Sequence, residues 1–324
     1  MVTARPPDPA PAASLVDRRA GEQSRARYPD ESGYVERDGV RVFWERYGEG
    51  SPTILLLPTW SIIHSRHWKF QIPFLARSFR VVTLDGRGNG RSDRPADPAA
   101  YADTEVVADA VAVLDAVGAD RAVIAGLSMG GGYALRMAAD HPDRVLGAVF
   151  IGPAVDLGWP DPTREHHPFH DELDTDEGWA KYNAHAWRRD WPGFVEWFFG
   201  EVFSESHSTK HIEDALGWGL DTDPETIIAA EAAPYGQTTE DGHTLTGRVA
   251  AEALAARVRC PCLVIHGTAD RIIPYSAGEE LATRLGAQLV RLEGSGHSPI
   301  GREPVLTNLL IRDFVRSIDA GRPS

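Results

Sequence analysis

The segment Gly126-Leu127-Ser128-Met129-Gly130 has the spacing of a serine nucleophile on a sharp turn. An apolar run precedes it and an amphipathic run follows it, which predicts a strand before the serine and a helix after it. Glycines on both sides would let the strand and the helix approach closely, because neither glycine carries a side chain. The Ser128 hydroxyl would then project beyond the sheet at a helix N-terminus, where developing negative charge is favoured.

A serine hydroxyl is a weak nucleophile at neutral pH, so this prediction requires a histidine base and a carboxylate that orients it. Asp270 ends the apolar run CLVIHGTAD, and His297 lies in EGSGHSPI, after the next apolar run. All three residues would then lie in loops at the carboxyl ends of parallel strands, on one edge of the sheet. We therefore predict that Ser128 is the nucleophile, that His297 moves its proton, and that Asp270 holds the imidazole tautomer.

Acyl transfer also needs backbone amides that bind the oxyanion formed when the nucleophile attacks a carbonyl group. For a serine on such a turn, one amide comes from the next residue and the other from the loop after an earlier strand. We predict that these donors are the amides of Met129 and of Trp60, which follows the run TILLLP.

Short apolar runs separated by helical stretches predict the sheet that positions these residues. The runs TILLLP, RVVTLD, RAVIAG, LGAVFIG and CLVIHGTAD are apolar on both faces, as is typical of parallel strands covered by helices on both sides. Before them, YVERDGVRVFWERYG alternates around Asp38-Gly39 and predicts an antiparallel hairpin. A last helix is expected from about Pro304 to Asp319. The predicted class is α/β, with a mostly parallel central sheet and helices on both faces.

The order serine, aspartate, histidine and several local motifs resemble the α/β-hydrolase superfamily. The motifs are GLSMGG at the serine, DGRGNGRSDRP after a strand, HGTADRIIP at the aspartate and GSGH at the histidine. The resemblance covers nearly the whole chain except its first residues and a middle insertion, and it implies an α/β-hydrolase fold with a serine hydrolase activity. Many members have His-Gly before the second oxyanion donor, whereas this chain has Pro58-Thr59-Trp60.

The chain divides into a tail, a core and an insertion. Residues 1–33 are rich in Pro, Ala and charge and are expected to be disordered. Residues 34–155 and 256–324 form the predicted core, and 156–255 a helical lid over the carboxyl ends of the strands. The lid aromatics either form its own small core or line a substrate site, which would favour an apolar or aromatic substrate. Most of the nine tryptophans lie in it: Trp159, Trp179, Trp187, Trp191, Trp197 and Trp218.

Composition excludes several other classes of protein. A formal net charge of −14 opposes binding to nucleic acid and to anionic membranes, and no apolar run reaches membrane-spanning length. We therefore expect a cytoplasmic protein with a small-molecule substrate.

GRGNG fits a dinucleotide loop poorly, because its third glycine comes one residue early and no helix follows. No cofactor is expected, and metal-free catalysis is predicted because histidine pairs lack a third ligand: His64 with His67, His167 with His170, and His207 with His211.

These residues predict a serine hydrolase that cleaves a carboxylic ester or lactone through an acyl-enzyme intermediate. Superfamily members that the sequence resembles also cleave carbon-carbon bonds next to carbonyl groups or perform perhydrolysis with the same three residues. A ligand receptor built on the same frame, with little turnover, is a further alternative. The natural substrate and the oligomeric state are not readable from the sequence.

Overall fold

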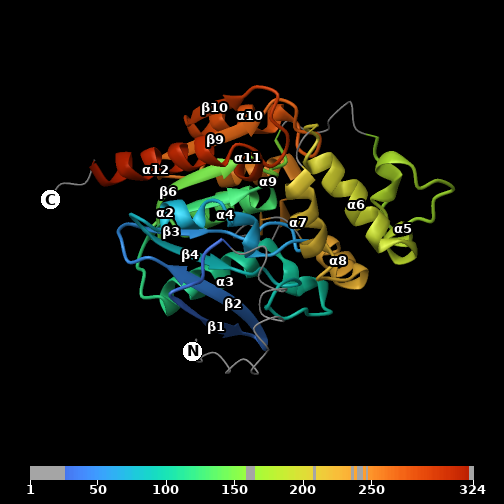
Figure 1. Cartoon of the computed structure of the whole chain (residues 1–324), viewed down its shortest axis with the longest axis horizontal. Helices are drawn as coiled ribbons and strands as arrows, with labels where there is room; N and C mark the ends of the chain where they lie inside the picture. Colours follow the sequence, from blue (N-terminus) through green and yellow to red (C-terminus); the bar gives the residue numbers. More distant parts are fainter. Residues whose placement is uncertain are drawn as a thin grey trace.

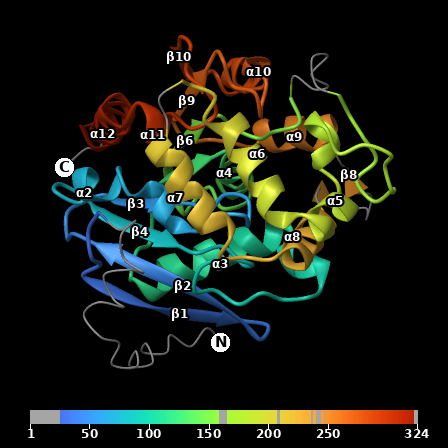
Figure 2. The same ribbon diagram turned by 45° about the vertical axis from the view of Figure 1, so that its right-hand side comes forward.

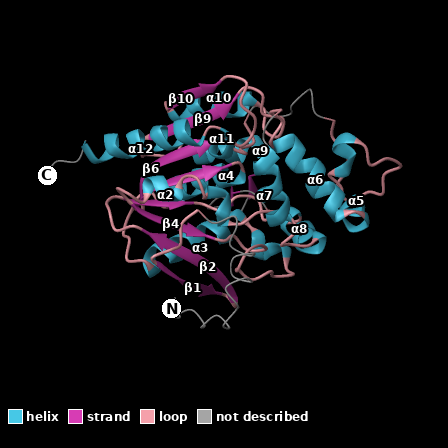
Figure 3. Ribbon diagram, in the orientation of Figure 1, coloured by secondary structure: helices cyan, strands magenta, loops and turns pink. Residues whose placement is uncertain are grey.

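The computed structural model describes residues 26–157, 165–206, 209–234, 237–238, 244–245 and 247–320. An eight-stranded sheet with the order β1-β2-β4-β3-β5-β6-β9-β10 runs through the centre of the molecule (Figures 1 and 3). β2 pairs antiparallel with β1 and β4, and every other neighbouring pair is parallel. The strands are β1 (Glu31–Arg37), β2 (Val40–Tyr47), β3 (Thr53–Leu56), β4 (Arg80–Leu84), β5 (Ala122–Leu127), β6 (Val145–Ile151), β9 (Cys262–Gly267) and β10 (Gln288–Leu292).

Alternate residues of the central strands pack into two separate layers of core. Ile54 and Leu56 of β3 contact one apolar cluster, whereas Leu55 and the following Leu57 contact the other. All four side chains are fully buried, because successive side chains of a strand point to opposite faces and helices cover both faces here. The sequence prediction of an α/β class with a mostly parallel sheet is therefore confirmed.

Helices form both covering layers. One layer contains α3 (Asp103–Ala116), α4 (Met129–Asp140) and α10 (Tyr275–Leu285). The other contains α2 (Ile72–Leu75) and α12 (Pro304–Ala320), which begins at the predicted residue. Shorter helical segments complete the frame: η1 (Ser65–Trp68), η2 (Pro98–Tyr101) and α11 (Pro299–Arg302).

A group of helices between β6 and β9 projects to one side of the sheet, and it comes forward in Figure 2. Its aromatic side chains pack with Trp60, so these helices lie over the loop that follows β3. We call α5, α6, α7 and α8 the cap. The segments between β6 and β9 are η3 (Gly178–Lys181), α5 (Ala184–Arg189), α6 (Trp191–Val202), α7 (Thr209–Gly219), α8 (Pro224–Glu231), β7 (Gln237–Thr238), β8 (Thr244–Leu245) and α9 (Gly247–Ala255).

The chain differs from the predicted division at two places. β1 begins at Glu31, so its first residues lie within the stretch predicted to be a tail; they pair with the end of β2. α9 lies within the predicted insertion, yet it packs against α4 and contributes Leu254 to the core beneath the sheet. The rest of the predicted tail, residues 1–25, and Trp159 lie outside the described residues.

Candidate active site

Ser128 lies on the turn between β5 and α4, in a backbone conformation that side chains rarely adopt. Its φ is 56° and its ψ is −122°, and its amide donates to the carbonyl of Ile151 at 2.9 Å. A Cβ added to Gly126 would lie 1.9 Å from the carbonyl oxygen of Gly130, and one added to Gly130 would lie 2.5 Å from that of Pro58. The two glycines therefore allow a turn that no other residue would fit, and it presents Ser128 at the carboxyl end of the sheet.

Asp270 and His297 are in direct contact. Nδ1 of His297 lies 2.8 Å from Oδ2 of Asp270, and both side chains are buried. The other carboxylate oxygen accepts hydrogen bonds from the amides of Ile272 and Ile273, at 2.8 and 2.9 Å. A carboxylate at Nδ1 keeps the proton on that nitrogen, which leaves Nε2 of His297 able to accept a proton.

Ser128 and His297 line one cavity at this edge of the sheet. No hydrogen bond joins the Ser128 hydroxyl to His297 within the part of the chain that the structure describes. Hydrogen bonds of this kind are often long without substrate and shorten when it binds. The geometry thus brings the predicted base, His297, into contact with the carboxylate of Asp270, and it places the predicted nucleophile, Ser128, at the same cavity.

The charges around Asp270 keep it ionised. Burial by itself would raise the pKa of Asp270, but electrostatic attraction to the His297 imidazole and the hydrogen bonds from both histidines outweigh burial and hold the pKa well below its usual range. Asp270 is therefore a fixed negative charge that can stabilise an imidazolium on His297.

A second histidine, His266, binds the same carboxylate, and the sequence analysis did not select it. Its Nε2 lies 3.1 Å from Oδ2 of Asp270 and 3.2 Å from the carbonyl oxygen of Ile273. A carbonyl can only accept, so Nε2 carries the proton and donates to both oxygens. The signal in the sequence was a lone histidine inside the apolar run CLVIHG, and its side chain is fully buried.

Replacing His266 should change the pH dependence of turnover. In His266→Leu, Asp270 loses one of the hydrogen bonds that hold its pKa down, so the coupled Asp270–His297 pair binds a proton more readily. The acid limb of the kcat/KM profile should move up by about 0.5 to 1 pH unit. His266→Gln retains an N–H donor and should shift the limb less. A purely structural effect would lower the rate equally at every pH and leave the limb in place.

Of the two predicted oxyanion donors, Met129 directly follows Ser128 in the chain and Trp60 lines the cavity. Met129 is the first residue of α4, and Trp60 lies in the loop after β3. Neither backbone amide donates a hydrogen bond within the described residues, so both remain available to an oxyanion. The buried hydroxyl of the neighbouring Thr59 also lacks a partner there, and Thr59 lines the cavity. The indole of Trp60 packs against the cap, with its ring centroid 5.0 Å from that of Phe198.

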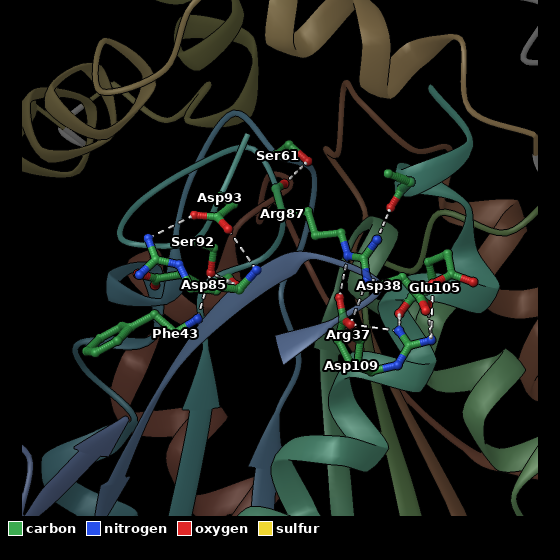
Figure 4. Close-up of polar contacts among 12 residues, drawn as sticks. Arg37, Asp38, Phe43, Ser61, Asp85, Arg87, Ser92, Asp93, Glu105 and Asp109 are labelled. Atoms are coloured by element: carbon green, nitrogen blue, oxygen red, sulfur yellow. Dashed lines mark hydrogen bonds and ion pairs between the residues drawn. The ribbon is translucent and has the colours of Figure 1, made fainter. Parts of the chain in front are cut away.

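The turn after β4 supports the Trp60 loop through buried charges (Figure 4). The hydroxyl of Ser61 donates to the carbonyl of Arg87 at 2.8 Å. The Arg87 guanidinium in turn donates to both oxygens of Asp109, at 2.6 and 2.9 Å, and Arg37 donates to the same carboxylate at 2.8 Å. Because Arg87 and Asp109 are almost completely buried, this network fixes the turn against α3.

The same turn also connects the Trp60 loop to the cap. The side-chain amide of Asn89 donates to the carbonyls of Ser61, at 3.1 Å, and of Trp218 in α7, at 3.3 Å. The Thr222 hydroxyl donates to the carbonyl of Gly88 at 2.8 Å. The segment GRGNG therefore has a structural role as a junction between the Trp60 loop and the cap.

The cavity is mostly apolar, and the cap forms its roof. Phe198, Phe199 and Trp218 line it, whereas Trp187 is completely buried within the aromatic cluster of the cap. Some cap aromatics therefore form the core of the cap and others line the cavity; that the cavity holds substrate stays a prediction. Polar side chains that the sequence analysis did not assign to a substrate site also line the cavity: His67, Lys69, His211 and Asp214.

Comparison with known proteins defines the family. The model of the alpha/beta hydrolase fold family matches residues 52–304. The chain is 30% identical over 286 residues to AB hydrolase superfamily protein YisY of Bacillus subtilis, covering 86% of this chain and 96% of that protein. It is 31% identical over 294 residues to the 2-hydroxymuconate semialdehyde hydrolase of a Pseudomonas species, covering 87% and 93%. The chain therefore belongs to the alpha/beta hydrolase fold family, which confirms the resemblance found in the sequence.

A solved structure agrees with this assignment. A protein described as an N-acyl homoserine lactone degrading enzyme superposes with a TM-score of 0.68 at 28% identity, covering 87% of this chain and 99% of that one. Within the described residues, no helix is both long and apolar enough to cross a membrane. The same part of the chain holds no group of three or more His, Cys, Asp or Glu residues arranged to bind a metal ion.

Proposed function

We propose that the protein is a serine hydrolase that cleaves a carboxylic ester or a lactone with an apolar or aromatic portion. The observation that carries this proposal is the 2.8 Å contact of His297 with Asp270 beside a cavity that Ser128 also lines. Membership of the hydrolase family supports the reaction type. The relative described as degrading a lactone supports the choice of ester and lactone substrates.

The reaction follows from the positions of these groups. Oγ of Ser128 attacks the substrate carbonyl while Nε2 of His297 takes its proton, and Asp270 stabilises the resulting imidazolium. The backbone amides of Met129 and Trp60 bind the oxyanion of the tetrahedral intermediate. His297 then returns its proton to the leaving alcohol as the carbon-oxygen bond breaks. Water, activated by the same histidine, releases the acyl group from Ser128.

The apolar walls of the cavity determine which substrates gain binding energy. Phe198 and Phe199 of α6 and Trp218 of α7 bury apolar surface of a substrate placed beneath the cap. A small, highly charged ester gains nothing from these walls. We therefore expect kcat/KM to rise with the apolar area of the acyl group or of the leaving group.

A substrate panel tests the proposal. We expect turnover of p-nitrophenyl and phenyl esters of increasing chain length and of alkyl lactones, with an initial burst of p-nitrophenol where deacylation is slow. Tight ligand binding without turnover would support a receptor instead. Activity only on carbon-carbon bonds next to a carbonyl, or only with added peroxide, would assign one of the other reactions considered from the sequence.

A further inference from the structure

One wall of the mostly apolar cavity carries two polar side chains with unused hydrogen-bonding capacity. His67 belongs to η1 and Lys69 directly follows it, and both line the cavity together with Ser128 and His297. A polar side chain buried in an apolar cavity costs stability unless it is hydrogen-bonded. The hydrogen-bonding capacity left over at this wall therefore indicates what the cavity is built to hold.

His67 provides an unused hydrogen-bond acceptor. Its Nδ1 lies 2.9 Å from the carbonyl oxygen of His64, which can only accept, so the proton is on Nδ1. Burial lowers the pKa of His67 to about 4, against the weaker opposing effect of the hydrogen bond to the carbonyl of His64, so the ring is neutral near pH 7. Nε2 then carries no proton and can accept a hydrogen bond. It is buried, and it has no hydrogen-bond partner within the described residues.

Lys69 provides unused hydrogen-bond donors. Its ammonium pairs with Oδ2 of Asp214 in α7, and no other hydrogen-bond partner is present in the described part of the chain. The rings of Phe70 and Trp218 lie beside it, with centroids 5.1 and 5.8 Å from Nζ. An ammonium has three N–H groups, so N–H donors remain after the contact with Asp214. Its side chain is only 11% exposed, which leaves little water to bind them.

The charge balance favours an uncharged ligand group. Lys69 and Asp214 neutralise each other, and Lys210, 3.1 Å from the other carboxylate oxygen of Asp214, is itself paired with Glu213 at 3.3 Å. A carboxylate placed beside this pair would add an uncompensated charge next to Asp214, which is costly in a buried site. A neutral hydroxyl can accept a hydrogen bond from Lys69 and donate one to His67 without changing the net charge of the site.

We propose that His67 and Lys69 determine substrate specificity by binding an uncharged hydroxyl on the apolar portion of the substrate. The O–H group donates to Nε2 of His67, and its oxygen accepts from Nζ of Lys69. This inference rests on the proposed function, because it concerns the cavity in which Ser128 would act. The substrate class is thus a neutral ester or lactone with one additional hydrogen-bonding group.

Matched substrates test the proposal on the wild-type protein. The acyl series consists of p-nitrophenyl hexanoate, its 3-hydroxy and 6-hydroxy derivatives, the corresponding methyl ethers, and the half-ester of adipic acid. The alcohol series consists of butyrate esters of phenol and of hydroxymethyl phenols. Hydrolysis of these esters is measured through the protons that it releases. We expect at least one hydroxy substrate to exceed its plain parent by about tenfold in kcat/KM. Its methyl ether and the charged half-ester should lose this advantage.

Variants separate recognition from a merely structural role. In Lys69→Met and His67→Phe, the ratio of kcat/KM for the preferred hydroxy substrate to that for its parent should fall to about one. His67→Gln restores an acceptor and should restore part of the ratio. Lys210→Met, the matched control, changes an exposed lysine on the same aspartate and should keep the wild-type ratio. Loss of packing alone would lower both rates together and leave the ratio unchanged.

The outcomes distinguish this inference from the proposed function. Turnover of plain esters with no preference for any hydroxy substrate would overturn the specificity proposal and leave the hydrolase proposal intact. A preference that persists unchanged in both Lys69→Met and His67→Phe would also overturn it. Absence of turnover of every ester in the wild-type protein would instead contradict the proposed function. If His67→Phe fails to fold, the Lys69→Met ratio and the wild-type substrate series still decide the question.

Discussion

Replacing Ser128 with alanine is expected to lower kcat/KM for a preferred p-nitrophenyl ester by at least about 10³-fold. The hydroxyl is the only group of the protein that forms a bond to the substrate carbon in the proposed reaction, so its loss removes the acyl-enzyme route. Alanine leaves the cavity slightly larger and retains the Cβ. Kinetic measurements on the purified variant, together with its thermal unfolding midpoint, test this result and verify that the protein is folded.

Ser298 provides a matched control for this experiment. It is also a serine that lines the cavity, and it directly follows His297 in the chain. Ser298→Ala should retain most of the wild-type rate, because its hydroxyl has no step in the proposed reaction. If Ser128→Ala kept more than a few per cent of the activity while Ser298→Ala lost it, the assignment of the nucleophile would be wrong.

Asp270→Asn is expected to lower kcat by about 10⁴-fold. One carboxylate oxygen accepts from two imidazole nitrogens, and the other accepts from the amides of Ile272 and Ile273. An asparagine amide group therefore faces two N–H donors in either orientation. If its NH₂ group faces His297, the imidazole must move its proton to Nε2 to accept at Nδ1, and it can then no longer take a proton from Ser128.

The same substitution should also destabilise the fold, because it buries unpaired N–H groups at about 1–3 kcal/mol each. Thermal unfolding measured beside kcat separates the two effects, since a folded but inactive variant identifies the loss of the base. Asp270→Glu, which keeps the charge, is the comparison for packing. Turnover unchanged in Asp270→Asn would mean that another carboxylate orients His297.

Much of this site could be predicted because its determinants are local. The turn at Ser128 is encoded by glycines at positions where a Cβ would clash with backbone atoms. The central strands are encoded by short runs that are apolar on both faces. Parallel pairing then places the ends of β5, β9 and β10 on one edge, which is why residues far apart in the chain were expected together. The family assignment and the fold class followed from these features.

The remaining features depend on contacts that no local pattern encodes. Lys69 and Asp214 are 145 positions apart and meet only because α7 lies across the end of η1. His266 reaches Asp270 because the loop after β9 turns back on itself, although strand periodicity alone shows only that the histidine is buried. The helix α9 lies within the predicted insertion in the sequence, yet its small residues let it pack on α4.

Labelling with a fluorophosphonate tests the central claim most directly, because such a reagent bonds covalently only to an activated serine hydroxyl. Peptide mass mapping of the labelled wild-type protein should place one adduct on Ser128. His297→Ala and Ser128→Ala should lose that adduct, and Ser298→Ala should keep it. An adduct on another serine, or labelling of Ser128 at the same rate without His297, would contradict the account.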